Sequence, residues 1–126
     1  MTSNTVLVVE DEPLLRMLLA DALAAAGFEV DEAANSDEAL ELVNLRDEAI
    51  AALITDIQMP GALDGCALAW RIHELFPEAE ILVVSGVTRP KPGDLPVNAR
   101  FLPKPVVPEQ LALELRGTLR QGAEGR

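Results

Sequence analysis

The sequence is short of positive charge. Its 126 residues include 10 Lys and Arg against 21 Asp and Glu, which gives a formal net charge of -11. Binding to nucleic acid or to an anionic membrane surface needs a basic face, so this imbalance argues against both kinds of partner. An acidic chain of this kind suits a protein that meets cations or basic partners.

The sequence also has few metal-binding side chains other than carboxylates. Cys66 is the only cysteine, so the chain can form no internal disulfide and no Cys-based zinc site. His73 is the only histidine, and a lone histidine without nearby ligands does not make a transition-metal site. Any metal site must therefore be built from oxygen ligands.

Long hydrophobic runs are missing too. The most apolar region, residues 14–28, is interrupted by Arg16, Asp21 and Gly27, which is too soon for a membrane span. Residues 1–5 carry no basic residue ahead of an apolar stretch, so they do not resemble a signal peptide. We therefore expect a cytoplasmic protein.

What the sequence does have is an alternation of strand-like and helix-like segments. Apolar residues make up 49% of the chain, enough for the core of a single domain. Short apolar runs typical of strands occur at residues 5–9, 28–31, 51–54, 81–84 and 100–102. Helix signals lie between or after them, with Ser36 and Asp64 as candidate N-caps. This alternation predicts an α/β fold with a parallel sheet.

One connection breaks the alternation. Residues 88–97 contain Pro90, Pro92 and Pro96, and each proline inside a helix would cost about 3 kcal/mol or more. We therefore expect the fourth helix, between the last two strands, to be degenerate or missing. A surface loop is the simplest interpretation of this segment, and a partner-specific surface is the alternative. We expect the domain to cover residues 1–120, followed by a short polar tail at 121–126.

The polar residues that interrupt the apolar pattern fall where predicted strands end. Glu10 and Asp11 follow the first strand, Asp56 ends the third, Ser85 the fourth and Lys104 the fifth. In a flavodoxin-like, doubly wound, five-stranded sheet of order 2-1-3-4-5, the first and third strands are neighbours and the carboxyl ends form the binding crevice. Three carboxylates so close together need a counter-cation, and Mg²⁺ prefers oxygen ligands. Such a site suits phosphoryl transfer, with Asp56 as the nucleophile.

Several motifs together resemble the receiver domain of two-component response regulators. They cover nearly the whole chain in the family's order: Val8-Val9-Glu10-Asp11-Glu12, Asp56-Ile57-Gln58-Met59-Pro60-Gly61, Asp64-Gly65, Val84-Ser85-Gly86 and Phe101-Leu102-Pro103-Lys104-Pro105. The first acid is Glu10, where Asp is the commoner residue in the family.

The resemblance implies a phosphoacceptor switch rather than an enzyme. Asp56 would accept a phosphoryl group from a phosphohistidine on a sensor histidine kinase or a histidine phosphotransfer protein, and the switch would signal to an unknown downstream protein. The chain would contribute to its own phosphorylation and autodephosphorylation. The implied ligands of Mg²⁺ are Glu10, Asp11, Asp56 and the backbone carbonyl of Gln58.

The resemblance also assigns roles around the phosphoryl group. Lys104 would pair with the phosphoryl oxygens, and the Ser85 hydroxyl would move to hydrogen-bond the phosphate. Phe101 would turn inward behind Ser85 as the switch aromatic, although a phenylalanine on a short edge strand is equally well explained as core. A cis peptide bond before Pro105 is implied as well.

Alternative functions stay open on the sequence. The chain could be a receiver-like interaction module that works without phosphorylation, or a receiver excised from a hybrid histidine kinase. A hydrolase of the haloacid-dehalogenase kind would form an aspartyl phosphate too. That family carries Asp-x-Asp after the first strand, where this chain has Glu10-Asp11-Glu12. The sequence names neither the kinase nor the downstream partner.

Overall fold

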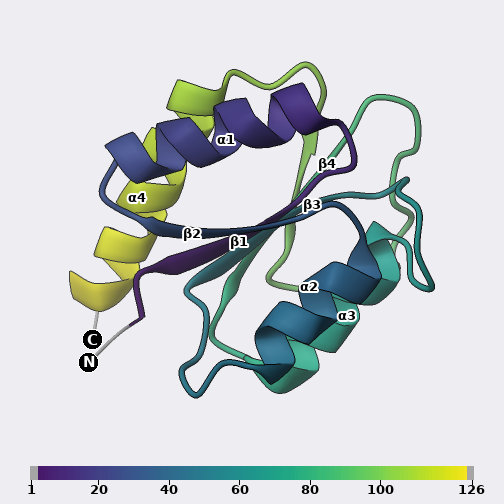
Figure 1. Cartoon of the computed structure of the whole chain (residues 1–126), viewed down its shortest axis with the longest axis horizontal. Coiled ribbons are helices and arrows are strands. Elements are labelled where there is room, and N and C mark those ends of the chain that lie inside the picture. Colours follow the sequence, from purple (N-terminus) through teal and green to yellow (C-terminus); the bar gives the residue numbers. More distant parts are fainter. Residues whose placement is uncertain (1–2, 125–126) are drawn as a thin grey trace.

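A five-stranded sheet in the order β2-β1-β3-β4-β5 forms the centre of the molecule (Figure 1). The computed structural model describes residues 3–124. All neighbouring strands are parallel, so the predicted order is confirmed. The strands are β1 Thr5–Val9, β2 Glu29–Ala33, β3 Ala52–Asp56, β4 Glu80–Ser85 and β5 Arg100–Pro103, and the helices are α1 Pro13–Ala25, α2 Ser36–Asn44, α3 Gly65–Leu75 and α4 Pro108–Glu124.

The helices cover both faces of the sheet. In Figure 1, α1 and α4 lie on one side of the strands and α2 and α3 on the other. Successive residues of β1 point to opposite sides: Leu7 and Val9 join the core beneath α2 and α3, whereas Val6 and Val8 join the core beneath α1 and α4. Because both faces are buried, the central strands are apolar throughout instead of alternating.

The connection between β4 and β5 contains no helix in the described structure, as the prolines predict. Instead, residues 91–94 form a tight turn in which the Asp94 amide donates to the Lys91 carbonyl at 2.9 Å. Pro92 and Gly93 occupy the two central positions, and Gly93 has φ +90°. A turn with proline first and a positive-φ glycine second is of type II, which explains why glycine is needed there.

One predicted helix cap was wrong. The N-cap of α2 is Asn35, whose side chain accepts the Glu38 amide, whereas the Ser36 hydroxyl accepts the Leu63 amide at 3.0 Å. At the other end of the chain, α4 continues past residue 120 to Glu124. Residues 108–124 contain no proline after the first position and are rich in good helix formers, so nothing ends the helix earlier. Residues 125–126 lie outside the described residues, and the domain boundary at 120 stays a prediction.

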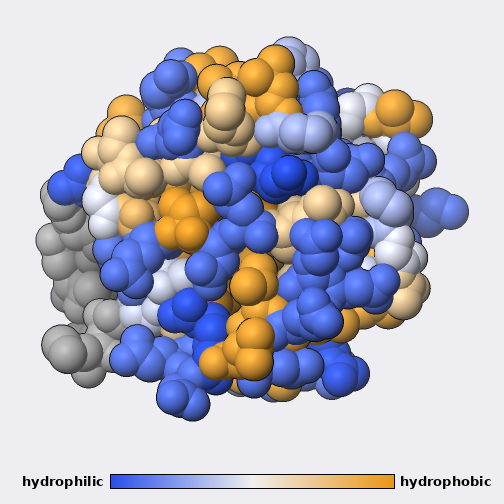
Figure 2. Space-filling model, in the orientation of Figure 1, coloured by the Kyte–Doolittle hydropathy of each residue, from blue (hydrophilic) through white to orange (hydrophobic). Residues whose placement is uncertain are grey.

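One face of the molecule is mainly polar. Figure 2 shows one face of the molecule, where hydrophilic residues predominate and hydrophobic ones form small patches between them. No helix within residues 3–124 is both long and apolar enough to cross a bilayer. The cytoplasmic location expected from the sequence stays a prediction.

Gly65 provides a test of how tightly β3 and α3 meet. A Cβ at this position would lie 1.9 Å from the carbonyl oxygen of Asp56. Because that oxygen belongs to the backbone, the clash could be relieved only by moving α3 away from β3. We expect Gly65→Ala to lower the free energy of unfolding by about 3 kcal/mol, measured by urea denaturation. The control is Gly117→Ala in α4, where a Cβ meets nothing within 4 Å and a gain of about 0.5–1 kcal/mol is expected. Equal effects at both positions would contradict the close approach at Gly65.

Candidate functional site

The strand-end residues singled out in the sequence meet at one edge of the sheet. Oxygen atoms of Glu10, Asp11 and Asp56 all lie within 4.8 Å of one another. The ammonium of Lys104 lies 2.7 Å from Asp56 Oδ2 and 3.2 Å from Glu10 Oε1. Because β1, β3, β4 and β5 are parallel, residues far apart in the sequence reach the same edge, and the Lys104 side chain crosses β4 to reach the acids.

Glu10 is the most buried member of the cluster, with 1% of the residue exposed. Both carboxylate oxygens are used: Oε1 accepts from Lys104, and Oε2 accepts the Glu12 amide at 3.1 Å. Burial raises the pKa of Glu10, and the Asp11 side chain adds to this, whereas the Glu12 amide and Lys104 offset only part of the rise. Ionising Glu10 is therefore less favourable in the folded protein than in water.

Lys104 supplies the positive charge that the acids need. Burial lowers the pKa of its ammonium, but the hydrogen bonds and charges of Asp56 and Glu10 outweigh this effect and raise the pKa overall. The side chain thus stays charged at neutral pH. Its backbone is fixed as well, because the Lys104 amide donates to the Ser85 carbonyl at 3.0 Å. The Lys104–Pro105 peptide bond is cis, as the resemblance implied.

Asp56 is buried but borders more accessible groups. Only 8% of the residue is exposed, and its Oδ1 accepts the Gln58 amide at 3.2 Å while Oδ2 accepts from Lys104. Asp11 beside it is exposed.

The donor atoms fit a hard divalent cation. The cluster offers only carboxylate oxygens, which Mg²⁺ prefers, and the described residues bring no nitrogen or sulfur ligand to it. Three carboxylates and one ammonium leave a formal charge of -2, which a divalent ion neutralises. Both oxygens of Glu10 and both oxygens of Asp56 already accept hydrogen bonds, so a bound ion would share them with Lys104 and the backbone amides of Glu12 and Gln58. The carbonyl of Gln58 as a further ligand stays a prediction.

The two residues predicted to switch lie on β4 and β5. Ser85 is 4% exposed, and its hydroxyl oxygen accepts the Thr88 amide at 3.2 Å. Phe101 is half-buried against the core beneath α2 and α3, and the guanidinium carbon of Arg89 lies 5.8 Å from the centre of its ring. Phe101 therefore contributes to the core, and its role as a switch stays a prediction.

Sequence reasoning missed one residue that shapes the site. Arg16 of α1 donates from Nη1 to the Glu10 carbonyl at 2.8 Å and lies 3.7 Å from the Glu32 carboxylate. It thereby fixes the turn that carries the two acids. The only signal in the sequence was that Arg16 lies one helical turn after Pro13, and this signal is weak.

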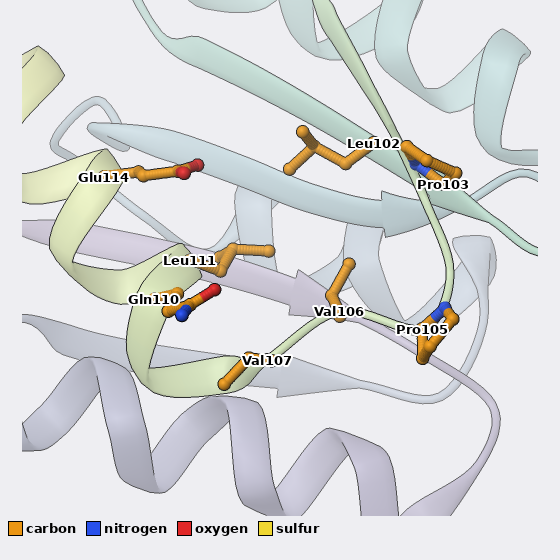
Figure 3. A pocket seen from close by; sticks show the side chains of 8 residues that line it. All are labelled: Leu102, Pro103, Pro105, Val106, Val107, Gln110, Leu111 and Glu114. Carbon is orange, nitrogen blue, oxygen red and sulfur yellow. The ribbon is translucent and has the colours of Figure 1, made fainter.

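A pocket of about 160 Å³ lies apart from the acidic cluster, between β5, the residues after it and the start of α4. Figure 3 shows the side chains around it, which are mostly apolar: Leu102, Pro103, Pro105, Val106, Val107, Gln110, Leu111 and Glu114. Neither Asp56 nor Lys104 is among them, so this pocket is distinct from the acidic cluster.

A family model described as the response regulator receiver domain matches residues 6–116. The chain belongs to this family. The sensor kinase CckA of Brucella abortus (strain 2308) is 35% identical over 122 residues, which are 94% of this chain and 13% of that protein. The response regulator receiver protein CpdR of the same strain is 34% identical over 117 residues, 90% of this chain and 95% of that protein.

A solved structure leads to the same family as the sequence relatives. The receiver domain of the hybrid histidine kinase CckA superposes with a TM-score of 0.77 at 34% identity, covering 91% of this chain and 98% of that one. Receiver domains are phosphoacceptor switches that bind Mg²⁺ in an acidic site and interact with histidine kinases or phosphotransfer proteins. This membership argues against the hydrolase alternative. The chain spans only a small part of CckA but nearly all of CpdR.

The raised pKa of Glu10 predicts how stability depends on pH. As pH rises above about 4.5, the unfolded state ionises first, so the free energy of unfolding falls until the folded state ionises as well. In Glu10→Gln the side chain at position 10 cannot ionise, so the variant does not show this fall in the free energy of unfolding. We expect the stability of the wild type relative to Glu10→Gln to fall as pH rises above about 4.5, the ordinary pKa of a glutamate, measured by urea denaturation in EDTA. A relative stability that rises with pH would show that Lys104 and the Glu12 amide dominate instead.

Proposed function

We propose that Asp56 accepts a phosphoryl group from a phosphohistidine in a reaction that needs Mg²⁺. The observation that supports this most is the position of Lys104, whose ammonium contacts Asp56 Oδ2 at 2.7 Å at the edge where three carboxylates gather. The contact with Lys104 holds the Asp56 carboxylate in place, and a carboxylate can act as a nucleophile. Asp11 and Asp56, with Glu10 and the carbonyl of Gln58, would hold the ion.

In the proposed reaction, a carboxylate oxygen of Asp56 forms a bond to phosphorus while the bond from phosphorus to the donor's imidazole nitrogen breaks. The nitrogen keeps the electron pair. Bound Mg²⁺ would neutralise the negative charge on the phosphoryl oxygens. Lys104 pairs with one of those oxygens and positions it, and the Ser85 hydroxyl donates a hydrogen bond to another. Hydrolysis of the acyl phosphate by water returns Asp56 to its starting state, which is the proposed autodephosphorylation.

The phosphodonor is proposed to be a histidine kinase or a histidine phosphotransfer protein. Of the two relatives from Brucella abortus, CckA is named a sensor kinase and CpdR a receiver protein. Receivers similar to this chain therefore occur both within a kinase and as separate proteins. The acceptor chemistry is the same in both settings. A receiver of a hybrid histidine kinase thus remains the second candidate.

The acceptor residue can be tested with acetyl phosphate and Mg²⁺. We expect a phosphoryl mass increment on the intact protein, lost in Asp56→Asn because the amide is not a nucleophile. The control is Asp64→Asn, which removes a carboxylate from the N-cap of α3 and should leave the increment intact, since Asn caps equally well. A mass increment that persists in Asp56→Asn, or none in the wild type with any phosphodonor, would refute the proposal.

Metal binding can be measured through stability. Mg²⁺ at ten times its Kd should raise the free energy of unfolding by about 1.4 kcal/mol, because it binds the folded state only. Asp11→Asn should reduce this gain at the same concentration, whereas Asp37→Asn, an exposed acid in the first turn of α2, should not. An equal gain in all three proteins would show that the ion binds elsewhere.

A further inference from the structure

Ser36, the first residue of α2, does not cap the helix that it begins. Asn35 accepts the Glu38 amide at 2.8 Å, and the Glu38 side chain accepts the Ala34 amide at 2.9 Å, so this end of the helix is capped without the serine. Ser36 is fully buried, with 0% of the residue exposed, and its hydroxyl oxygen accepts the Leu63 amide at 3.0 Å. The serine therefore serves a contact outside α2.

The amide that Ser36 accepts belongs to the loop between β3 and α3, residues 57–64, here called the β3–α3 loop. The loop is closed at its base by a backbone hydrogen bond of 2.8 Å from the Gly65 amide to the first carbonyl of the loop. Gln58 follows directly, and its amide donates to Asp56 Oδ1 at 3.2 Å. The loop thus carries, beside the acceptor aspartate, the residue whose carbonyl is a predicted ligand of Mg²⁺.

The tip of the β3–α3 loop lies directly on the start of α2. A Cβ at Gly61 would lie 2.6 Å from Ser36 Oγ and 3.2 Å from the Ser36 backbone nitrogen. The φ of Gly61 is +119°, a backbone conformation that glycine adopts at no steric cost. There is thus no room for a side chain between Gly61 and Ser36, and the bond to the Leu63 amide fixes the loop on the same serine.

The same part of the chain also contacts the turn that carries the other two acids. The Ala33 carbonyl, at the end of β2, accepts the Glu10 amide at 3.0 Å, and both Ala33 and Ser36 are buried. Residues 33–36 therefore touch the turn of Glu10 and Asp11 on one side and the β3–α3 loop on the other. They join the two parts of the chain that the proposed ion would bring together.

We propose that Ser36 is a positioning residue for the ion site, because it holds the β3–α3 loop so that Gln58 stays beside Asp56. The inference rests on the proposed function, since it concerns the site in which Mg²⁺ would be held. Mg²⁺ demands near-ideal octahedral geometry, so its oxygen ligands must be well placed. Ordering a loop on binding costs affinity, and a loop that is already held avoids this cost. Loss of the Ser36 hydroxyl therefore weakens Mg²⁺ binding although Ser36 is not itself a ligand.

The first test compares Ser36→Ala with Asn35→Ala. Ser36→Ala leaves the Leu63 amide without its acceptor, whereas Asn35→Ala removes the cap of α2 and leaves the contact with the loop in place. The Kd of Mg²⁺ is measured by titration, with the amide signals of Asp11 and Gln58 followed by NMR. We expect the Kd to rise about two- to tenfold in Ser36→Ala, the range that one hydrogen bond contributes. Asn35→Ala should bind Mg²⁺ as the wild type does.

Gly61→Ala perturbs the same contact from the side of the loop, and it tests the inference independently of how well Ser36→Ala folds. The added Cβ must push the loop away from Ser36 Oγ, so the Kd of Mg²⁺ should rise here as well. In the double variant with Ser36→Ala that oxygen is absent. The further rise caused by Gly61→Ala should then be smaller than in the wild type, because the two residues are in contact.

Phosphorylation by acetyl phosphate separates positioning from a direct part in the reaction. Because Ser36 acts through the ion site, the Mg²⁺ concentration that gives half the maximal rate should rise about two- to tenfold in Ser36→Ala. The rate at saturating Mg²⁺ should match that of the wild type. Exchange of the Leu63 amide with solvent should become faster by a similar factor, about two- to tenfold, because its hydrogen bond is lost.

The outcomes distinguish this inference from the proposed function. Phosphorylation of Asp56 with an unchanged Kd of Mg²⁺ in both Ser36→Ala and Gly61→Ala overturns the positioning role and leaves the proposed function standing. Equal weakening of Mg²⁺ binding in Ser36→Ala and Asn35→Ala also overturns it, because the effect would then come from the stability of α2. A wild type that neither binds Mg²⁺ nor accepts a phosphoryl group overturns both.

Discussion

The contact of Lys104 with Asp56 and Glu10 is the interaction on which the site depends. Carboxylates gathered at a buried sheet edge repel one another, and one of them, Glu10, is almost fully removed from water. Removing one partner from a buried ion pair leaves an uncompensated charge, which destabilises a protein far more than the intact pair stabilises it. The ammonium also fixes geometry, because one nitrogen within 3.2 Å of two different acids ties the ends of β1 and β3 to β5.

The members of this cluster could be predicted from the sequence because each of them lies at the end of a strand. Strand ends are marked locally by where apolar runs stop, and parallel strands bring their carboxyl ends to one edge. Asp56 and Lys104 could therefore be placed together although 48 positions separate them. The missing helix was predictable for an equally local reason, since prolines exclude a helix whatever surrounds them.

The errors and omissions share a different cause. Ser36 has the chemistry of an N-cap, but the Leu63 amide, 27 positions away, uses its hydroxyl, and Asn35 caps the helix instead. In the same way, only a weak local signal marks the contact of Arg16 with the Glu10 carbonyl, and none marks that of Trp70 with the Asp94 carbonyl. Such bonds depend on the path of a loop in space, and loop paths carry no periodicity that a sequence pattern can reveal.

The arrangement of contacts also limits how a change at Asp56 can leave the site. Glu10, Asp56 and Lys104 are bonded chiefly to one another, and the backbone of Glu10 is held on both sides, by the Ala33 carbonyl and by Arg16. These groups can change their charge balance but have little freedom to move. Ser85 differs, because its hydroxyl is bonded to the Thr88 amide of a segment outside the sheet. Movement of the Ser85 hydroxyl, which stays a prediction, would therefore alter a contact outside the sheet, whereas the other groups of the cluster would mainly change their charge balance.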